Sequence, residues 1–480
     1  MAVLRSHLAL TVSSVERSAP FYEATRSSDS PPRAGSGPRP PGPRLPVALQ
    51  ALLLFRDPVG YLERCRRRYG PVFRIKFPGA PPLVYVTDPS LARELYGHDR
   101  DGNRAGEARK PYLSPLVGEH SVLCLEGEQW QRQRRLLAPP LHGQRVAEWR
   151  DEIAGIAKKE VDSWPAGEEI ELRPRMQSIT LEVILRVVFG IEDAGRLDRL
   201  RRLLPALLDA VDSPLVFGAP RVRERLERSP LLSRLPGNPV RRFEATRAAT
   251  DELLYEEIAR RRAETASRLE GRADLLSTLL LARDEQGNGM ADEELRDELV
   301  TLLTAGHETT ATALAWAFER LVRHPLVLER LLGELEEGRT EYLDAVVKEV
   351  LRARPVVFDT PRALSGPLSL GGYEVPAGWW AAPAIPLVHR SAELFDDPDT
   401  FDPERFLGED PPVGGWIPFG GGQRRCLGSR LALLELQTVI SAVLTRRTLT
   451  APDPSPEKRR VQHVTLAPAR RARVVTELRA

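Results

Sequence analysis

The segment over residues 419–428, Phe-Gly-Gly-Gly-Gln-Arg-Arg-Cys-Leu-Gly, is the feature that most limits how this chain can fold. Its three consecutive glycines let the backbone pass flat and close to a broad partner, because no Cβ holds it away. The strong helix formers of residues 429–437 follow, so Cys426 enters a helix N-terminus. The free N–H groups there, and two adjacent arginines, favour a thiolate over a thiol.

Three interpretations of Cys426 compete. A lone cysteine is usually a small buried hydrophobe. A nucleotide-binding loop would require Gly-Lys-Ser/Thr, or a Gly-x-Gly-x-x-Gly turn opening a Rossmann unit, and neither is present. A shielded thiolate against a planar partner matches the fifth ligand of a haem iron. The whole ten-residue segment favours this third interpretation and makes Cys426 the candidate metal ligand.

Composition excludes several classes of protein. The chain has 480 residues, with 69 basic and 67 acidic ones and a net charge of +2, so no overall charge favours nucleic acid. Its three cysteines cannot form a disulfide framework or a four-thiolate metal site, which favours a reducing cytoplasm. No segment approaches the roughly 18 apolar residues that span a bilayer.

The N-terminal region differs in composition from the rest. Residues 27–46 are too rich in Pro, Gly and Ser to pack, and residues 1–30 lack the layout of a secretory signal. We therefore expect a disordered Pro/Ser/Arg-rich leader over residues 1–45. No second linker divides residues 46–480, which we predict to be one large domain.

The periodicity of that domain predicts a mainly α fold with small β-sheets. Residues 71–77 and 83–87 indicate a hairpin, residues 368–376 another strand and turn, and residues 461–475 a closing hairpin around residues 467–469. An apolar stripe over residues 343–351 predicts a helix that ends before Pro355.

The longest predicted helix runs from Asp292, a plausible N-cap, to Arg323. Its flanks are conventional and supply apolar residues such as Leu299 and Leu314, but residues 304–312 read Thr-Ala-Gly-His-Glu-Thr-Thr-Ala-Thr. Gly306 alone costs about 1 kcal/mol relative to alanine, and threonines can bend a helix by bonding its backbone. When the centre of a buried helix contains residues that disfavour helix formation and burial, a functional site is indicated there.

Five motifs then follow one another in a characteristic order. They are Trp-x-x-x-Arg at 130–134, the acid–alcohol segment at 305–310, Glu-x-x-Arg at 349–352, Pro-Glu-Arg-Phe at 403–406 and the cysteine segment. In this order the chain resembles the haem-thiolate monooxygenases of the cytochrome P450 superfamily, most of all the soluble bacterial type, over about residues 46–480. The resemblance implies a triangular, helix-rich domain with haem between the long central helix and the cysteine loop.

The resemblance also implies roles for individual residues. Cys426 would be the axial thiolate, Phe419 would pack against its side, and Gly422 and Gly428 would let the loop approach the porphyrin. Glu308 and Thr309 match the acid–alcohol pair that relays protons to bound dioxygen. The remaining cofactor-binding positions are Ala305 and Gly306 on the central helix and, for the two propionates, Trp130, Arg134, Arg362 and Arg424. His307 occupies a variable position of the motif, so we expect it to be structural or solvent-facing.

Glu349, Arg352 and Arg405 match a buried triad that fixes the segment leading to the cysteine. The spacing Glu-x-x-Arg alone is weak, because it also occurs at Glu63/Arg66 and elsewhere as an ordinary i,i+3 pair worth about 0.2–0.5 kcal/mol. Only the pair of Glu349 and Arg352 has the Pro-Glu-Arg-Phe motif as the next motif along the chain, followed by the cysteine segment. Their role would be structural.

The predicted function is insertion of one oxygen atom of O2 into a lipophilic small molecule, by hydroxylation or epoxidation of a terpene, steroid, fatty acid or polyketide. Haem b would be the cofactor. Electrons would come from NAD(P)H through a reductase and a ferredoxin or similar acidic donor, docking on a basic patch. That patch comprises Arg132, Arg135, Arg425 and Arg430.

We further expect a cytoplasmic monomer with no transmembrane anchor and no nucleic-acid partner. Two other enzyme classes are possible: a peroxide-driven peroxygenase and a haem-thiolate isomerase. Both often lack the acid–alcohol pair, so Glu308 and Thr309 argue against them. A non-enzymatic haem sensor or electron carrier is the alternative from another class, and it would not need a helix disrupted at its centre.

Overall fold

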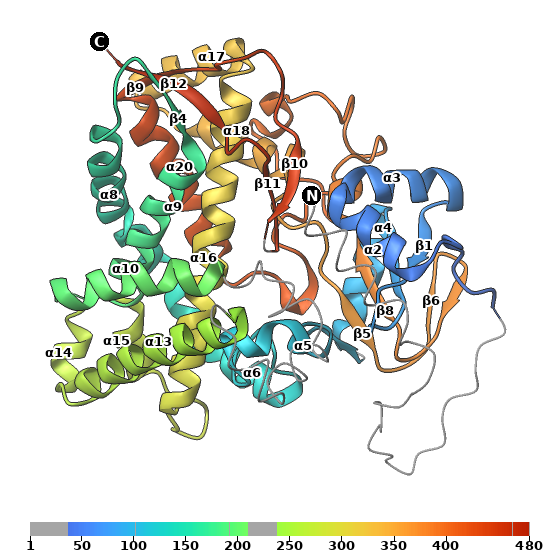
Figure 1. Cartoon of the computed structure of the whole chain (residues 1–480), viewed down its shortest axis with the longest axis horizontal. Helices are drawn as coiled ribbons and strands as arrows, with labels where there is room; N and C mark the ends of the chain where they lie inside the picture. Colours follow the sequence, from blue (N-terminus) through green and yellow to red (C-terminus); the bar gives the residue numbers. More distant parts are fainter. Residues whose placement is uncertain (1–36, 101, 192, 210–237, 463, 480) are drawn as a thin grey trace. The chain divides into compact units, whose positions relative to one another are not determined.

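The computed structural model describes residues 37–100, 102–191, 193–209, 238–462 and 464–479, and this part of the chain is mainly helical with small sheets, as predicted (Figure 1). Residues 37–480 form one compact unit. In the described part no helix is long and apolar enough to cross a membrane.

The helices before the central one are α2 Val47–Arg56, α3 Pro58–Tyr69, α4 Pro89–Gly97, α5 Ala105–Val117, α6 Gly127–Leu137, α7 Gln144–Glu148, α8 Arg150–Asp162, α9 Leu172–Val183, α10 Ala194–Asp209, α13 Pro239–Arg262, α14 Ala266–Glu270 and α15 Leu275–Leu281. The central helix α16, Asp292–Leu321, is followed by α17 Pro325–Glu336, α18 Glu341–Ala353, α19 Ile385–Val388 and α20 Ser429–Leu444. Short 3-10 turns η1 His98–Arg100 and η6 Gly422–Arg424 flank the site described below.

The strands form four small sheets. The largest has the order β1-β2-β8-β5-β3, and a three-stranded sheet has the order β4-β12-β9. Two hairpins, β6–β7 and β10–β11, complete the set. Their bounds are β1 Val72–Ile75, β2 Leu83–Val86, β3 Asn103–Arg104, β4 Glu168–Glu171, β5 Arg362–Leu364, β6 Leu368–Leu370, β7 Tyr373–Val375, β8 Trp380–Pro383, β9 Arg447–Thr450, β10 Arg459–Gln462, β11 Thr465–Pro468 and β12 Arg473–Leu478. The predicted hairpins over 71–87 and 368–376 are therefore confirmed.

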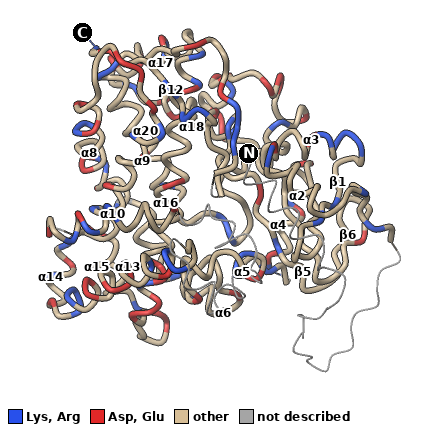
Figure 2. The backbone as a smooth tube through the Cα atoms, viewed as in Figure 1, with Lys and Arg blue, Asp and Glu red and all other residues tan. Residues whose placement is uncertain are grey.

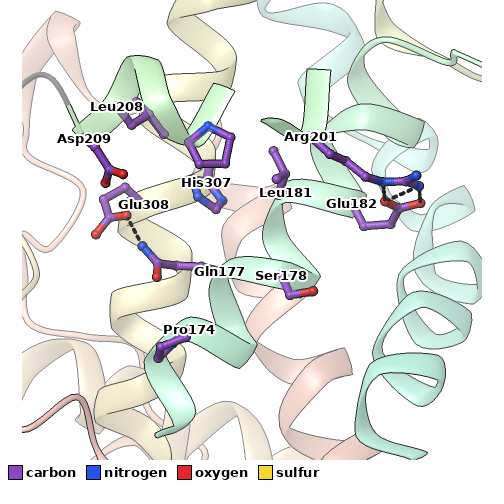
Figure 3. A pocket seen from close by; sticks show the side chains of 11 residues that line it. Pro174, Gln177, Ser178, Leu181, Glu182, Arg201, Leu208, Asp209, His307 and Glu308 are labelled. Carbon is purple, nitrogen blue, oxygen red and sulfur yellow. Dashed lines mark hydrogen bonds and ion pairs between the residues drawn. The ribbon is translucent and has the colours of Figure 1, made fainter. Parts of the chain in front are cut away.

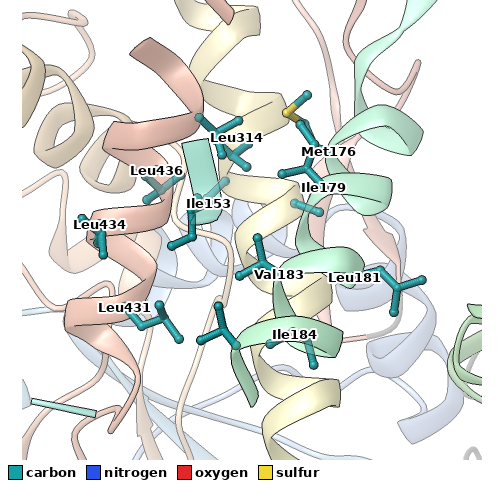
Figure 4. Close-up of a cluster of buried hydrophobic side chains, with 14 of the residues drawn as sticks. Ile153, Met176, Ile179, Leu181, Val183, Ile184, Leu314, Leu431, Leu434 and Leu436 are labelled. Atoms are coloured by element: carbon teal, nitrogen blue, oxygen red, sulfur yellow. The ribbon is translucent and has the colours of Figure 1, made fainter. Parts of the chain in front are cut away.

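Helix α16 is buried along most of its length and contacts α9, α18 and α20 (Figure 1). Residues 313–318 of α16, Ala-Leu-Ala-Trp-Ala-Phe, are apolar on all sides and are therefore stable only inside the protein. Leu314 of α16 lies within a core cluster with Met176 and Ile179 of α9 and Leu434 of α20 (Figure 4). This packing fixes the helix whose centre carries the acid–alcohol segment.

Two local predictions are wrong. Asp292 is the first residue of α16 and not its N-cap; Ala291 precedes the helix, and its N–H donates to the Glu294 carboxylate over 2.8 Å. The closing hairpin over 461–475 is also wrong, because β11 turns back onto β10, and β12 pairs with β4 and β9. The chain changes sheets through Arg471 and Ala472, which have φ of 61° and 54° without being glycine.

The predicted leader, residues 1–45, falls in two regions of the structure. Residues 1–36 lie outside the described part of the chain. Residues 37–45 belong to the compact unit: the Pro41 carbonyl accepts from the N–H of Arg74, and the Pro38 carbonyl accepts from the N–H of Glu374. These bonds attach the segment to β1 and β7.

Candidate functional site

The cysteine segment forms a closed loop that ends at the N-terminus of α20. The Cys426 N–H donates to the Phe419 carbonyl over 3.0 Å, and Gly428 caps α20. The Cys426 side chain has exposed surface, although the chain around it is dense enough for desolvation to raise the pKa of its thiol. The backbone of Gly428 and nearby arginines oppose this rise by favouring the thiolate.

The glycines of this loop are needed for packing against α4 and η1. Gly420 and Gly422 have φ of 68° and 66°, a region that favours glycine. A Cβ on Gly421 would overlap the Tyr96 ring, and one on Gly422 would overlap the Asp99 carboxylate. Their contact with the porphyrin, expected from the resemblance, stays a prediction; the structure supplies this second reason for their presence.

Arg362, predicted to bind a propionate, is almost fully buried and paired with a carboxylate that the sequence analysis missed. Its Nε and Nη2 donate to the two oxygens of Asp99 over 2.7 and 3.2 Å. Nη2 also donates to the Gly421 carbonyl over 3.3 Å. Arg362 therefore joins β5 to both η1 and the cysteine loop.

Arg424 and Arg134 both lie against the ring of Trp130. The resemblance implied that these three residues belong to one propionate-binding site. The guanidinium carbons of Arg424 and Arg134 are 4.1 and 5.6 Å from the ring centroid. Arg134 also donates to the Arg425 carbonyl over 3.0 Å. The structure thus brings three of the four predicted propionate residues into one stacked group.

Glu126 is the counter-charge of this group. It forms an ion pair with Arg424, and its other oxygen accepts from the N–H groups of Gly106 and Glu107 at the start of α5. Arg424 also donates to the Leu125 carbonyl over 2.9 Å. One carboxylate therefore holds both the N-terminus of α5 and the cysteine loop.

Arg109 of α5 is a further basic residue of this site that sequence reasoning missed. Desolvation, together with the positive charges of Arg362 and Arg424, lowers its pKa to about 10. Its charge also acts on Cys426. No sequence motif marks Arg109, because its placement depends on how α5 packs over the loop.

The centre of α16 presents one accessible stripe in an otherwise buried helix. Ala305 is exposed and Thr309, one turn later, is partly so. The Thr309 hydroxyl donates to the Ala305 carbonyl over 2.6 Å. Gly306 lies beside this stripe, and a Cβ there would approach the end of the Ile184 side chain to 2.9 Å. His307 is buried and bonded to Thr180 over 2.8 Å, so it is structural and not solvent-facing.

Glu308 is more deeply buried than the sequence indicated. Its side chain is 5% exposed, and it forms an ion pair with the equally buried Arg173 of α9. The Gln177 amide donates to its second oxygen over 2.8 Å (Figure 3). Arg173 and Gln177 carry no motif of their own, and sequence reasoning missed both.

A surface cavity of about 440 Å3 reaches Glu308 between α9, α10 and α16 (Figure 3). Its walls include Gln177, Glu182, Arg201 and His307. Glu308 therefore borders solvent-accessible space on this side, while Thr309 belongs to the accessible stripe of α16.

The predicted triad comes together. Both oxygens of Glu349 accept from Arg352, over 2.6 and 2.8 Å, and both side chains are fully buried. Arg405 Nε lies 3.5 Å from Glu349. Arg352 also donates to three backbone carbonyls, those of His389, Pro398 and Thr400.

His389 connects this triad to the cysteine loop and was missed by sequence reasoning. It is fully buried, and the Ile417 N–H donates to its Nε2 over 2.8 Å. Nε2 is therefore unprotonated, and Nδ1–H donates to the Arg352 carbonyl over 3.1 Å. Beside it, the Trp416 indole N–H donates to the Lys348 carbonyl over 3.0 Å. Two side chains thus fasten the start of the loop to α18.

The predicted basic patch is only partly available. Arg132 is paired with Asp284 at 2.7 Å and Glu294 at 2.8 Å, so it stabilises the turn before α16. Arg425 and Arg430 are exposed, as is Arg135, which approaches Glu285 only to 3.5 Å. Basic and acidic residues are interspersed along the helices elsewhere (Figure 2).

These donors fit an iron-bearing planar cofactor with carboxylate substituents. Cys426 supplies a single soft ligand, and the described residues hold no cluster of three His, Cys, Asp or Glu side chains that would bind a metal ion instead. Arg134, Arg109 and the Trp130 indole provide cationic and ring contacts beside it. The small residues Ala305 and Gly306 leave the centre of α16 free of bulky side chains.

Comparison with known sequences agrees with this chemistry. Residues 38–474 match the family described as Cytochrome P450. The chain is 41% identical to the putative cytochrome P450 135B1 of Mycobacterium tuberculosis over 442 residues, covering 91% of this chain and 90% of the relative. It is 36% identical to the putative cytochrome P450 135A1 of the same species, covering 89% and 93%.

Solved structures share the fold. The retinoic acid-bound cyanobacterial CYP120A1 superposes with a TM-score of 0.77 at 23% identity, covering 92% of this chain and all of that one. The cytochrome P450DA heme domain gives the same TM-score and identity, covering 98% of its own chain.

The buried pair predicts a large effect on stability. Replacing Arg352 with methionine leaves Glu349 buried without its partner, which should lower the free energy of unfolding by about 3–5 kcal/mol. Arg66→Met is the matched control: Arg66 forms the same i,i+3 pair with Glu63, but its side chain is 47% exposed. That control should change stability by less than about 1 kcal/mol. Urea unfolding of both variants decides, and equal losses would contradict the structural role of the triad.

His389 predicts a pH dependence. Desolvation lowers its pKa from 6.5 to about 3, so below pH 6.5 the unfolded chain binds a proton that the folded chain does not. Stability is therefore lost as pH falls from 6.5 towards 3, by about 2 kcal/mol between about pH 7 and pH 5 from this group alone. Unfolding midpoints of wild type and His389→Asn should show a shallower slope for the variant. The exposed His142→Asn should keep the wild-type slope.

Proposed function

Because this chain belongs to the cytochrome P450 family and is a haem-dependent monooxygenase, we propose that it inserts one oxygen atom of dioxygen into a lipophilic small molecule. The observation that carries the proposal is the combination of the Cys426 loop with the accessible Ala305–Thr309 stripe of α16. Hydroxylation or epoxidation of a terpene, steroid, fatty acid or polyketide would suit such a site.

The cofactor we propose is haem b. When bound, haem supplies the iron that activates dioxygen, and an axial thiolate favours O–O cleavage. Cys426 would be that ligand. Trp130, Arg134, Arg362 and Arg424 would hold the propionates, with Arg109 as a fifth contributor.

The acid–alcohol pair would deliver the protons. The Thr309 hydroxyl donates its own proton to the Ala305 carbonyl, so its oxygen is free to accept from a water. Glu308 borders the cavity between α9 and α10, from which protons can enter. Arg173 and Gln177 hold the carboxylate at this wall, so Glu308 would exchange protons between solvent and the α16 stripe.

The segments that would line the substrate site are mixed in composition and mainly apolar, which suits a lipophilic substrate. They are residues 101–123, 205–240, 303–310, 356–359 and the turn near Thr465. Residues 210–237 among them lie outside the described part. Screening a lipophilic panel for ligands that shift the haem spin state tests the class, and a panel without any such ligand or oxidised product would favour the sensor alternative.

For the electron donor we propose an acidic ferredoxin or similar protein with its NAD(P)H-dependent reductase. Arg135, Arg425 and Arg430 remain exposed and would form the contact, whereas Arg132 is committed to Asp284 and Glu294. The monomeric state and cytoplasmic location predicted from the sequence remain predictions.

The relay predicts uncoupling. Thr309→Ala removes the hydroxyl that would hold the water, so NAD(P)H consumption should continue while product per NAD(P)H falls by about tenfold or more. Thr310→Ala is the control, because Thr310 is buried and outside the stripe. Product and NAD(P)H are measured together with a spin-shifting substrate. Unchanged coupling in Thr309→Ala would refute the assigned role.

The donor surface predicts a change in association. Reversing Arg425 and Arg430 to glutamate should raise the KM for an acidic ferredoxin by about tenfold at low salt, with a smaller difference at high salt because screening removes it. Arg446→Glu, on an exposed pair with Asp162, should leave this KM unchanged. Equal KM values in all variants would place the donor elsewhere.

A further inference from the structure

Two arginines converge at the C-terminal end of α18, away from the residues assigned above. Arg354 caps α18, and its Nη1 donates to the Ala353 carbonyl over 3.0 Å. Arg459 lies in β10, and its Nη2 donates to the same oxygen over 3.2 Å. Two nitrogens that bond one oxygen are close neighbours, so two positive charges meet at one carbonyl.

This pair differs in its partners from Arg352 and Arg362. Arg352 and Arg362 each form a bidentate pair with a carboxylate. Among the residues that the structure describes, no carboxylate lies within ion-pair distance of Arg354 or Arg459. The Nε atoms of both are buried and have no hydrogen-bond partner there. Each guanidinium therefore keeps donor capacity that the described chain does not use.

The surroundings add positive charge. Burial, together with the charges of Arg320 and Arg390, lowers the pKa of Arg354 to about 9 and the pKa of Arg459 to about 10. The nearby carboxylates have other partners: Glu319 pairs with Arg320, and Asp399 with Arg390. Asp57, which acts on Arg459 from a distance, lies 3.5 Å from Arg64.

The pair is partly open to solvent. The ring of Trp316 covers Arg354, with its centroid 5.3 Å from the guanidinium carbon. Both arginines are nevertheless only half-buried, so a small ion can reach them from solvent. A guanidinium fork binds oxyanions through paired N–H···O bonds.

We propose that Arg354 and Arg459 bind a phosphate group. Two adjacent cations match the two negative charges of phosphate better than the single charge of a carboxylate. The bound anion would tie β10 to the end of α18. The β10–β11 hairpin already contacts the segment after α18, through the Leu466 N–H and the Val356 carbonyl at 2.7 Å. Phosphate would therefore stiffen one wall of the region predicted to hold the substrate.

The test is a titration of the haem-loaded full-length protein with inorganic phosphate. Binding is measured by calorimetry and by the line width of the phosphorus NMR signal. Arg354→Gln and Arg459→Gln should each raise the dissociation constant for inorganic phosphate by at least about tenfold. Arg446→Gln should leave it unchanged, since Arg446 is similarly exposed but paired with Asp162. Glycerol phosphate, measured beside inorganic phosphate, tells whether the site takes a phosphate ester or the free ion; tight binding of either supports the proposal.

Folding of the variants is checked in phosphate-free buffer. Each of the two substitutions removes one of two adjacent positive charges, so the unfolding temperature of either variant should equal or exceed that of wild type. The proposal is overturned if phosphate stabilises wild type and both variants equally, which would be a general salt effect. Acetate binding more tightly than phosphate would overturn it too.

Discussion

The buried ion pair between Glu349 and Arg352 is the contact on which the position of the cysteine loop depends. Removing two charges from water is costly unless every donor and acceptor finds a partner. Arg352 meets this requirement with Glu349 and three backbone carbonyls in residues 389–400, and Glu349 also accepts from the Asp402 N–H. The intervening chain cannot shift without leaving a charge unpaired in the interior. His389 then transmits this fixed position to Ile417, the residue that begins the approach to Cys426.

The opposite side of the loop is held by the same physical means with different residues. Asp99 and Glu126 each neutralise one arginine, Arg362 and Arg424, and both arginines also donate to backbone carbonyls. Such a side chain cross-links segments that no strand or helix joins. Because these two arginines are also proposed propionate ligands, the contacts that build the loop and those that would hold the cofactor are shared. A cofactor bound there would therefore stabilise the loop, by mass action on the folded state.

The sequence predicted those parts of the site that are encoded by local spacing. Residues 130–134, 305–310, 349–352 and the cysteine loop were found because their order and spacing match the motifs of the family that the chain resembles. Their partners were not found. Asp99 meets Arg362 across 263 positions, and Arg173 meets Glu308 across 135, so only the tertiary fold selects them. The hairpin error has a similar cause, since the turn at Arg471 and Ala472 carries neither glycine nor asparagine to mark it.

The hydrogen-bond and charge partners also distinguish Arg352 from Arg354 and Arg459. Where an arginine only supports the fold, as Arg352 does, its carboxylate and carbonyl partners lie in the chain itself. At Arg354 and Arg459, by contrast, two guanidinium groups share one carbonyl, and their buried Nε atoms have no hydrogen-bond partner in the described part of the chain. Keeping two such cations adjacent costs folding energy, because each is desolvated and repelled by the other. An anion from solution would remove that cost, which is the physical reason for proposing a phosphate site at this pair.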